Sequence, residues 1–494
     1  MKITLVPRVA PNDCLRLWIG VLSSQMPALT WHLDNIPLNS PCVQPLRPLA
    51  SAIADELRDE RPVENFTGVF EISGLESGRV YKVSVTASTN GVITSAELRL
   101  KTLPSRIPDL LDGTFNVLLV SCFHHAEDRG GQAGLMASQL NSAARPDLTL
   151  LLGDQVYLDL PTLANFPANA AALAHKFEAD YRANWQGEAG YSQLLRLAPT
   201  ISVPDDHEYW NNFPHPSPFI QNSWTQSGRG NWTIAATDLY KAFQFAHERD
   251  AYFHGGPAEL GDASVIDIEP LSFFLADGRS LRDPGRATVL TTRARKQLEH
   301  WAAEVIRKRC TALFITGQSL LDSASSEWKG KIADYLMPNY GDFGHITATL
   351  GKLAEAGLPV ILITGDVHWG RVATIRDART GRESIFEIIS SPTSLASSVG
   401  RDQLVAVRDA VTGQTSVWPR HSSPDPVPEF LWFGGFGGRF SCSRTHEQVG
   451  NHVALLSFAR IGAGARMRVT YYPLHDDPLQ CKPRSLREMS LAPA

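Results

Sequence analysis

The chain of 494 residues is long enough for two domains, and its 46 Lys and Arg against 51 Asp and Glu give a formal net charge of -5. That balance, with no run of five basic residues, argues against an obligate nucleic-acid partner. No apolar stretch approaches the roughly 20 residues of a membrane span, so we expect no transmembrane segment. The start of the chain shows no secretory signal and the six cysteines lack CxxC spacing, so we expect a cytoplasmic protein.

The first part of the chain, residues 1–104, is predicted to be a β-sandwich. Residues 80–87 and 94–100 alternate between apolar and polar side chains, as half-buried strands do. Tyr81 follows a glycine-containing turn, an arrangement similar to the tyrosine corner of immunoglobulin and fibronectin type III domains. A plain antiparallel sheet with a glycine turn is the alternative.

Prolines 104 and 108 punctuate the chain after these strands, so we expect a second domain over residues 105–494. There, buried apolar strands alternate with helical segments, which predicts an α/β fold. The expected helices cover residues 164–185, 237–248, 292–309 and 346–355. Two closing strands at 451–458 and 465–472 are expected to form a hairpin that completes the sheet. The glycine-rich residues 434–438 lack the context of a phosphate-binding loop.

Four buried apolar runs end at side chains that bind metals. The runs at 117–120, 148–152, 201–203 and 360–364 lead into Ser121-Cys122, Gly153-Asp154-Gln155-Val156-Tyr157, Asp205-Asp206-His207-Glu208 and Gly365-Asp366-Val367-His368. Ligands in α/β sheets gather at the carboxyl ends of the strands. The pattern therefore indicates a dinuclear metal site able to activate water for phosphoester hydrolysis.

These four motifs, in this order, resemble the PhoD family of metallophosphoesterases, and the Gly153-Asp154-x-x-Tyr157 element is also similar to purple acid phosphatases. The resemblance covers roughly residues 110–475, and PhoD-like enzymes often carry a β-sandwich in front of the catalytic domain. It implies a metallophosphoesterase-type β-sandwich core flanked by helices, with the activity of an alkaline phosphatase or phosphodiesterase.

The residues themselves assign one role most clearly. The carboxylate of Asp154 could bridge two cations about 3.5 to 4 Å apart, while Tyr157 and Cys122 could add a phenolate and a thiolate, which favour iron. The resemblance implies Fe³⁺ on Cys122, Asp154, Tyr157 and His368, and a second cation, calcium or alternatively magnesium or manganese, on Asp206 and Asp366. The alternatives are that Cys122 is a buried small hydrophobe and Tyr157 a core aromatic.

His207 is expected to face the phosphate, where a protonated imidazole could donate its proton to the leaving oxygen during in-line attack by metal-bound hydroxide. Asp205 or Glu208 could orient it, although Asp205 is more simply expected to face solvent or cap a helix. Asn212, with Asn211 beside it, could contact phosphate or the second metal.

The chain departs from the family pattern at two places, and from the wider fold at a third. Histidines at 124 and 125 follow Cys122 where the family more often has Gln, and Lys329 follows Trp328 in place of an acid. Gln318 stands where the wider fold often places a metal-binding histidine, although PhoD-like proteins commonly share this amide.

The sequence thus predicts hydrolysis of a small-molecule or polymeric phosphate ester. A phosphodiesterase for lipid or cell-wall polymer esters is the competing enzyme hypothesis. A non-catalytic binding module with a degenerate site is the third, because a fold alone never proves activity. The natural ester and the oligomeric state are left open.

Overall fold

The computed structural model describes residues 1–39, 42–49, 64–128, 130–245, 258–322, 324–332, 334–377, 380–395, 426–427, 440–475 and 481–493. Three sheets organise this part of the chain. No helix in it is long and apolar enough to cross a membrane. The glycine-rich residues 434–438 lie outside the described residues.

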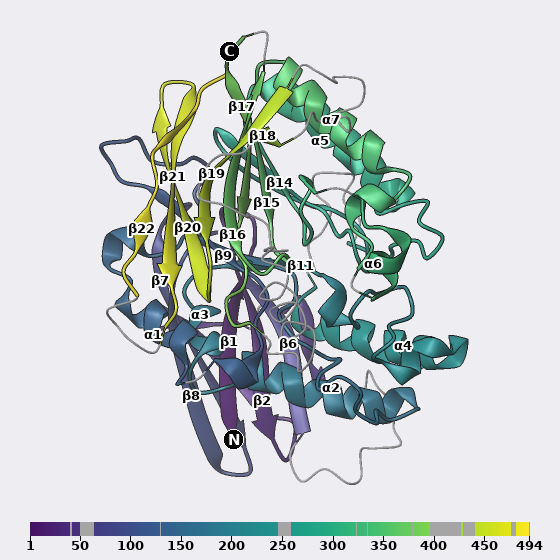
Figure 1. Cartoon of the computed structure of the whole chain (residues 1–494). Coiled ribbons are helices and arrows are strands. Elements are labelled where there is room, and N and C mark those ends of the chain that lie inside the picture. The colour runs from purple at the N-terminus through teal and green to yellow at the C-terminus, as the bar shows by residue number, and fades with distance from the viewer. Residues whose placement is uncertain are drawn as a thin grey trace.

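The first sheet joins the N-terminal strands, three parallel central strands and the C-terminal hairpin (Figure 1). From edge to edge it contains β22 (Arg484–Ser485), β21 (Gly464–Pro473), β20 (His452–Ile461), β9 (Phe115–Val120), β10 (Leu148–Leu152), β11 (Thr200–Val203), β1 (Lys2–Arg8), β2 (Leu15–Ser23), β6 (Glu64–Ile72) and β5 (Gln44–Pro48), with β23 (Met489–Leu491) on β21. The hairpin prediction is confirmed, since β20 pairs antiparallel with both β21 and β9.

The second sheet has a parallel centre of β13, β14, β15 and β17. Its order is β12 (Ser264–Ile268), β13 (Leu271–Leu275), β14 (Thr311–Ile315), β15 (Val360–Thr364), β17 (Glu383–Ile389), β16 (Gly370–Asp377), β19 (Phe440–Gln448) and β18 (Pro426–Val427). A small third sheet contains β4 (Ile36–Leu38), β3 (Ala28–Leu33), β7 (Val80–Thr89) and β8 (Val92–Lys101).

The two large sheets pack face to face and helices cover the outer face of each, which gives four layers. Side chains alternate between the two faces of each strand and so reach both neighbouring layers. Leu119 of β9 and Ile361 of β15 belong to one cluster between the sheets. Leu118, on the other face of β9, packs with the helices α2 (Ala170–Trp185) and α4 (Gln226–Phe243). Leu362 packs with α5 (Thr292–Lys308) and α7 (Phe343–Glu355), which lie side by side in Figure 1. Burial on both faces explains why these strands are continuous apolar runs.

The helix boundaries follow local capping. The Asn169 side chain accepts a hydrogen bond from the Ala172 N–H, so α2 begins after the expected residue 164. Thr225 caps Gly228 in the same way, and α4 therefore begins well before the expected residue 237. Helix α5 ends at Lys308, one residue before the expected end, and the C-cap residue Arg309 takes a left-handed conformation. Three short helices were not predicted: α1 (Gln132–Gln139), α3 (Tyr191–Leu194) and α6 (Glu327–Ile332).

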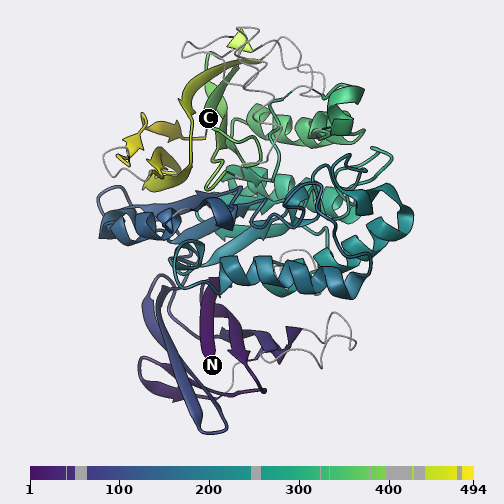
Figure 2. The ribbon, with the colours of Figure 1, turned by 60° about the horizontal axis from the view of Figure 1, so that its bottom comes forward.

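The N-terminal strands form a β-sandwich at one end of the molecule (Figure 2). Its core packs Leu17 and Val83 from facing sheets, and the Tyr81 hydroxyl accepts a hydrogen bond of 2.8 Å from the Glu76 N–H. Strand β1 also pairs with β11 through Arg8 and Thr200, so the sandwich shares a sheet with the rest of the chain. The immunoglobulin-like topology and the boundary at residue 104 stay predictions.

Candidate metal centre

The structure brings the predicted ligands together at the carboxyl ends of strands from both large sheets. Cys122 follows β9 and Asp154 follows β10. Asp206 opens the 3-10 turn η5 (Asp206–Glu208) after β11, and Asp366 and His368 follow β15. Because parallel neighbours end at the same edge, residues far apart in the chain meet there.

Backbone strain gathers at the same residues. Cys122, Asp154, Asn212, Asp366 and His368 have φ between 52° and 73°, and they make up five of the eleven non-glycine residues with positive φ in the described part of the chain. Side chains other than glycine rarely adopt this conformation, and such residues cluster at functional sites.

Two glycines allow the strand ends to approach each other closely. A Cβ on Gly365 would lie 2.2 Å from the Ser121 Oγ and 2.3 Å from the Leu152 carbonyl oxygen. A Cβ on Gly153, whose φ is +88°, would lie 2.6 Å from the Asp205 Cβ. Both Gly-Asp pairs therefore need glycine for space, and Gly153 needs it for its backbone conformation as well.

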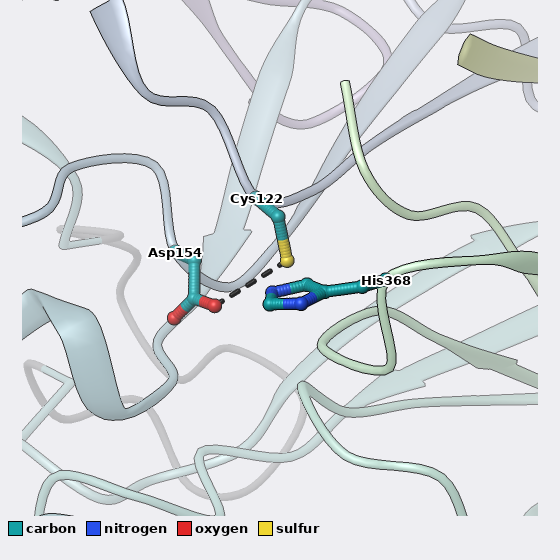
Figure 3. Close-up of side chains that lie close together, drawn as sticks. All are labelled: Cys122, Asp154 and His368. Atoms are coloured by element: carbon teal, nitrogen blue, oxygen red, sulfur yellow. Dashed lines mark hydrogen bonds between the residues drawn. The ribbon is translucent and has the colours of Figure 1, made fainter. Parts of the chain in front are cut away.

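Asp154 lies at the middle of the candidate centre. Ligand atoms lie within 4.8 Å of one another in three groups: Cys122, Asp154 and His368; Asp154, Asp206 and His207; and Asp154, Asp205, Asp206 and Asp366. Figure 3 shows the first group, in which the Cys122 Sγ lies 3.3 Å from the Asp154 Oδ2. Asp154 is common to all three groups, as a bridging ligand must be.

The Tyr157 hydroxyl lies in the same place without a hydrogen-bond partner among the described residues. The side chain is buried and packs against Cys122. Burial, and then the charges of Cys122 and Asp154, raise the pKa of the phenol. A buried polar atom without a partner calls for an explanation, and a cation between these groups would supply one.

The pKa values of the buried carboxylates also point to a bound cation. Burial and nearby carboxylates raise the pKa of Asp154 and of Asp366 well above the usual range. Burial also acts on Asp206, but the charges of His207 and Arg279 outweigh it and lower its pKa. Buried carboxylates that share one space are stabilised by bound cations. The donor set of thiol, phenol, imidazole and carboxylates therefore fits a metal centre.

His207 is oriented by Asp159, which the sequence analysis missed. The Nδ1 of His207 lies 2.8 Å from the Asp159 Oδ1, and the other oxygen of Asp159 accepts the Asn211 N–H at 2.8 Å. Burial alone would lower the pKa of His207, but the charges of Asp159, Asp206 and Asp154 outweigh burial and raise it. No pattern in the sequence pairs residue 159 with residue 207.

The Glu208 carboxylate binds backbone N–H groups, so it does not orient His207. Its carboxylate accepts the N–H groups of Asp154, Gln155 and Asp205 at 2.9, 2.6 and 2.8 Å. Burial raises its pKa to about 7. These hydrogen bonds fix the turn after β10, on which Asp154 is carried.

Asp205 was expected to face solvent or to cap a helix. It does not face solvent, since its residue surface is 1% exposed, but it is the N-cap residue of η5. It forms an ion pair with the buried guanidinium of Arg279, which also pairs with Asp334 at 2.8 Å. Arg279 was not predicted, although a signal exists: charged residues follow the apolar strand β13 just as they follow the four strands used above.

The remaining candidates lie around this centre. The Asn212 N–H donates to the Asp206 Oδ2 at 2.7 Å, and its buried Nδ2 has no partner among the described residues. The Gln318 amide oxygen accepts a hydrogen bond from Arg282 at 2.9 Å. The His124 ring lies 5.5 Å from that of Tyr157. Trp328 is 75% exposed.

Comparison with solved structures identifies the fold. The structure of PhoD aligns with a TM-score of 0.58 at 12% identity, over 99% of this chain and 92% of that one. The protein therefore has a PhoD-like fold, of mixed α/β architecture. The structure of GAP50, the anchor in the inner membrane complex of Plasmodium, aligns over 77% of this chain and 90% of that one at 8% identity, but its TM-score of 0.37 is too low to carry an argument. No family model matches the chain. No curated protein matches it either.

Proposed function

We propose that this protein hydrolyses phosphate esters at a dinuclear metal site, as a PhoD-like phosphomonoesterase or phosphodiesterase. One observation carries the proposal: within a PhoD-like fold, the Asp154 carboxylate belongs to three groups of converging ligand atoms. A bridging carboxylate between two cations is the arrangement that two-metal hydrolases use.

The first ion would be held by Cys122, Asp154, Tyr157 and His368, and the second by Asp154, Asp206 and Asp366. Thiolate, phenolate and imidazole favour Fe³⁺ in the first position, and carboxylate oxygens suit Ca²⁺, Mg²⁺ or Mn²⁺ in the second. When bound, such ions neutralise phosphate oxygens and lower the pKa of coordinated water.

His207 would supply the proton in this reaction. Its Nδ1 is committed to Asp159, so Nε2 is the nitrogen that can hydrogen-bond to the substrate. Asp159, which takes no part in the proposed metal binding, favours the protonated imidazole, and a protonated Nε2 can give its proton to the leaving oxygen. The free amide nitrogen of Asn212 would hold a phosphate oxygen beside it.

The first test combines elemental analysis with a visible absorption spectrum of the purified protein. Fe³⁺ bound to the phenolate of Tyr157 or the thiolate of Cys122 gives a charge-transfer band. About one iron and at least one second cation per chain, together with turnover of a chromogenic ester that Asp154→Asn abolishes, would support the proposal. Asp267→Asn, a half-exposed carboxylate paired with Lys308, is the matched control.

The same samples separate the alternatives. Turnover of a chromogenic diester but not of a monoester would favour the phosphodiesterase for lipid or cell-wall polymer esters. A colourless protein that retains no metal, and that reconstitution does not activate, would favour a binding module and contradict the proposal.

A further inference from the structure

A pocket lies at the opposite end of the strands that carry the candidate metal centre. It has a volume of about 610 Å³, within the range of about 300–1,000 Å³ that is usual for small-molecule sites. Its walls include Phe115 at the start of β9, Asp147 directly before β10, and Pro199 directly before β11. At about 3.3 Å per residue, a five-residue strand separates the two sites by roughly 17 Å.

The pocket lies where the N-terminal sandwich meets the rest of the chain. Arg99 and Lys101 of β8 form one wall. They flank Leu100, which is buried in the core of the sandwich. Because side chains alternate along a strand, Arg99 and Lys101 share the opposite face of β8. Arg106 and Arg145 contribute from the other side of the junction.

The charge of this pocket is not balanced by its own residues. Lys101 pairs with Asp147 at 2.8 Å, and Asp147 also accepts the Asn116 N–H. No ion pair or hydrogen bond engages the side chains of Arg99, Arg106 or Arg145 among the described residues. Asp112 is the other acidic residue of the lining.

Three exposed guanidinium groups without an ion-pair partner in the described part of the chain line this one pocket, in a protein whose formal net charge is -5. Like charges held together repel one another unless an anion joins them. Guanidinium groups bind phosphate oxygens in a bidentate manner, which makes arginine the preferred residue for phosphate recognition.

We infer that this pocket, defined by Arg99, Arg106 and Arg145, binds an anionic ligand that carries two or more phosphate groups. Three separate guanidinium groups are more than one phosphate group needs, and they suit a linear polyanion. The pocket is remote from the candidate metal centre, so the ligand is held here without being cleaved here. The inference does not depend on the proposed hydrolysis.

Isothermal titration calorimetry of the full chain with tripolyphosphate at low salt tests the inference. We expect binding at one site per chain that weakens as potassium chloride is added. Arg99→Gln, Arg106→Gln and Arg145→Gln should each weaken it at least about fivefold, since each removes one charge-assisted contact. Arg487→Gln, another exposed arginine, should leave it unchanged.

Two further titrations distinguish binding in this pocket from binding at the metal centre. Asp154→Asn should bind tripolyphosphate as the natural chain does. Loss of binding in Asp154→Asn, with no effect of the three arginine variants, would place the ligand at the metal centre and overturn the inference. Equal affinity for inorganic phosphate or for citrate would overturn the requirement for several phosphate groups.

Discussion

The Nδ1 atom of His207 lies 2.8 Å from the Oδ1 atom of Asp159. This contact joins the segment after β10, on which Asp154 lies, to the turn after β11. Asp159 is fully buried and its second oxygen is bound by a backbone N–H, so the carboxylate has little freedom to move. The imidazole is thereby held in one orientation, with Nδ1 toward Asp159.

Removing the charge of Asp159 should slow proton donation to the leaving group. We expect Asp159→Asn to lower kcat for an alkyl phosphate by roughly 100-fold. Nitrophenyl phosphate should be affected much less, because nitrophenolate leaves without a proton. Steady-state kinetics on both esters, with Asp267→Asn as control, measures the difference. Equal losses on both esters would show that Asp159 is merely structural.

Gly365→Ala should destabilise the protein and loosen the metal centre. The added Cβ would meet the Ser121 Oγ and the Leu152 carbonyl at distances no side chain tolerates, and such overpacking costs about 1–3 kcal/mol. Urea unfolding measures the loss. The matched control is Gly344→Ala, on an exposed position of α7 with nothing within 4 Å of the new Cβ; it should gain about 0.5 kcal/mol from helix propensity. Similar values for both variants would contradict the close approach at Gly365.

Asp154→Asn should change the stability of the protein in opposite directions with and without metal. In the metal-free protein, burial and neighbouring carboxylates oppose the charge of Asp154, so we expect the Tm to rise by roughly 2–4 °C. In the loaded protein the bridging ligand is lost and the Tm should fall. Thermal unfolding with and without a chelator tests this. A fall in both conditions would show that Asp154 is needed for the fold itself.

His452 should make the protein sensitive to mild acid. It is fully buried, its ring lies 2.7 Å from the Gly450 carbonyl, and burial lowers its pKa from 6.5 to about 4. The unfolded chain therefore takes up the proton first. Stability is complete above pH 6.5 and falls as the pH drops toward 4, by about 3 kcal/mol in all.

The variant His452→Asn should remove most of that pH dependence, since its amide can still donate to the Gly450 carbonyl but does not titrate. Urea unfolding between pH 7 and pH 4 measures the slope. His175→Asn, which changes an exposed histidine of α2, should leave the slope unaltered. An unchanged slope in His452→Asn would assign the acid sensitivity to other groups.

The sequence predicted best the elements whose residues are buried on both faces. Strands β10 and β15 are uninterrupted apolar runs, so their ends, and the candidate ligands Asp154 and Asp366 placed there, could be located. The start of α4 was missed because its first two turns include Gly228 and Gly230, which are poor helix formers, and the Thr225 cap and tertiary packing outweigh that cost.

The partners of the site residues were harder to predict. Whether Asp159 or Glu208 orients His207 depends on how two loops pack against each other. The hydrophobic periodicity of the sequence does not predict such packing. The solvent-facing prediction for Asp205 failed because its partner, Arg279, comes from a different sheet. Pairs of charges between sheets leave no local pattern.

The pairing of Arg8 with Thr200 means that the sandwich cannot be cut away cleanly. The Arg8 guanidinium also donates to the Gln244 carbonyl at 2.8 Å, and the Trp18 indole to the Ala242 carbonyl at 2.7 Å. A truncated chain starting at residue 105 would carry an open edge at β11, next to apolar surface that the first strands normally cover. Such an edge invites pairing between molecules, so expression of residues 105–494 alone is expected to give aggregates.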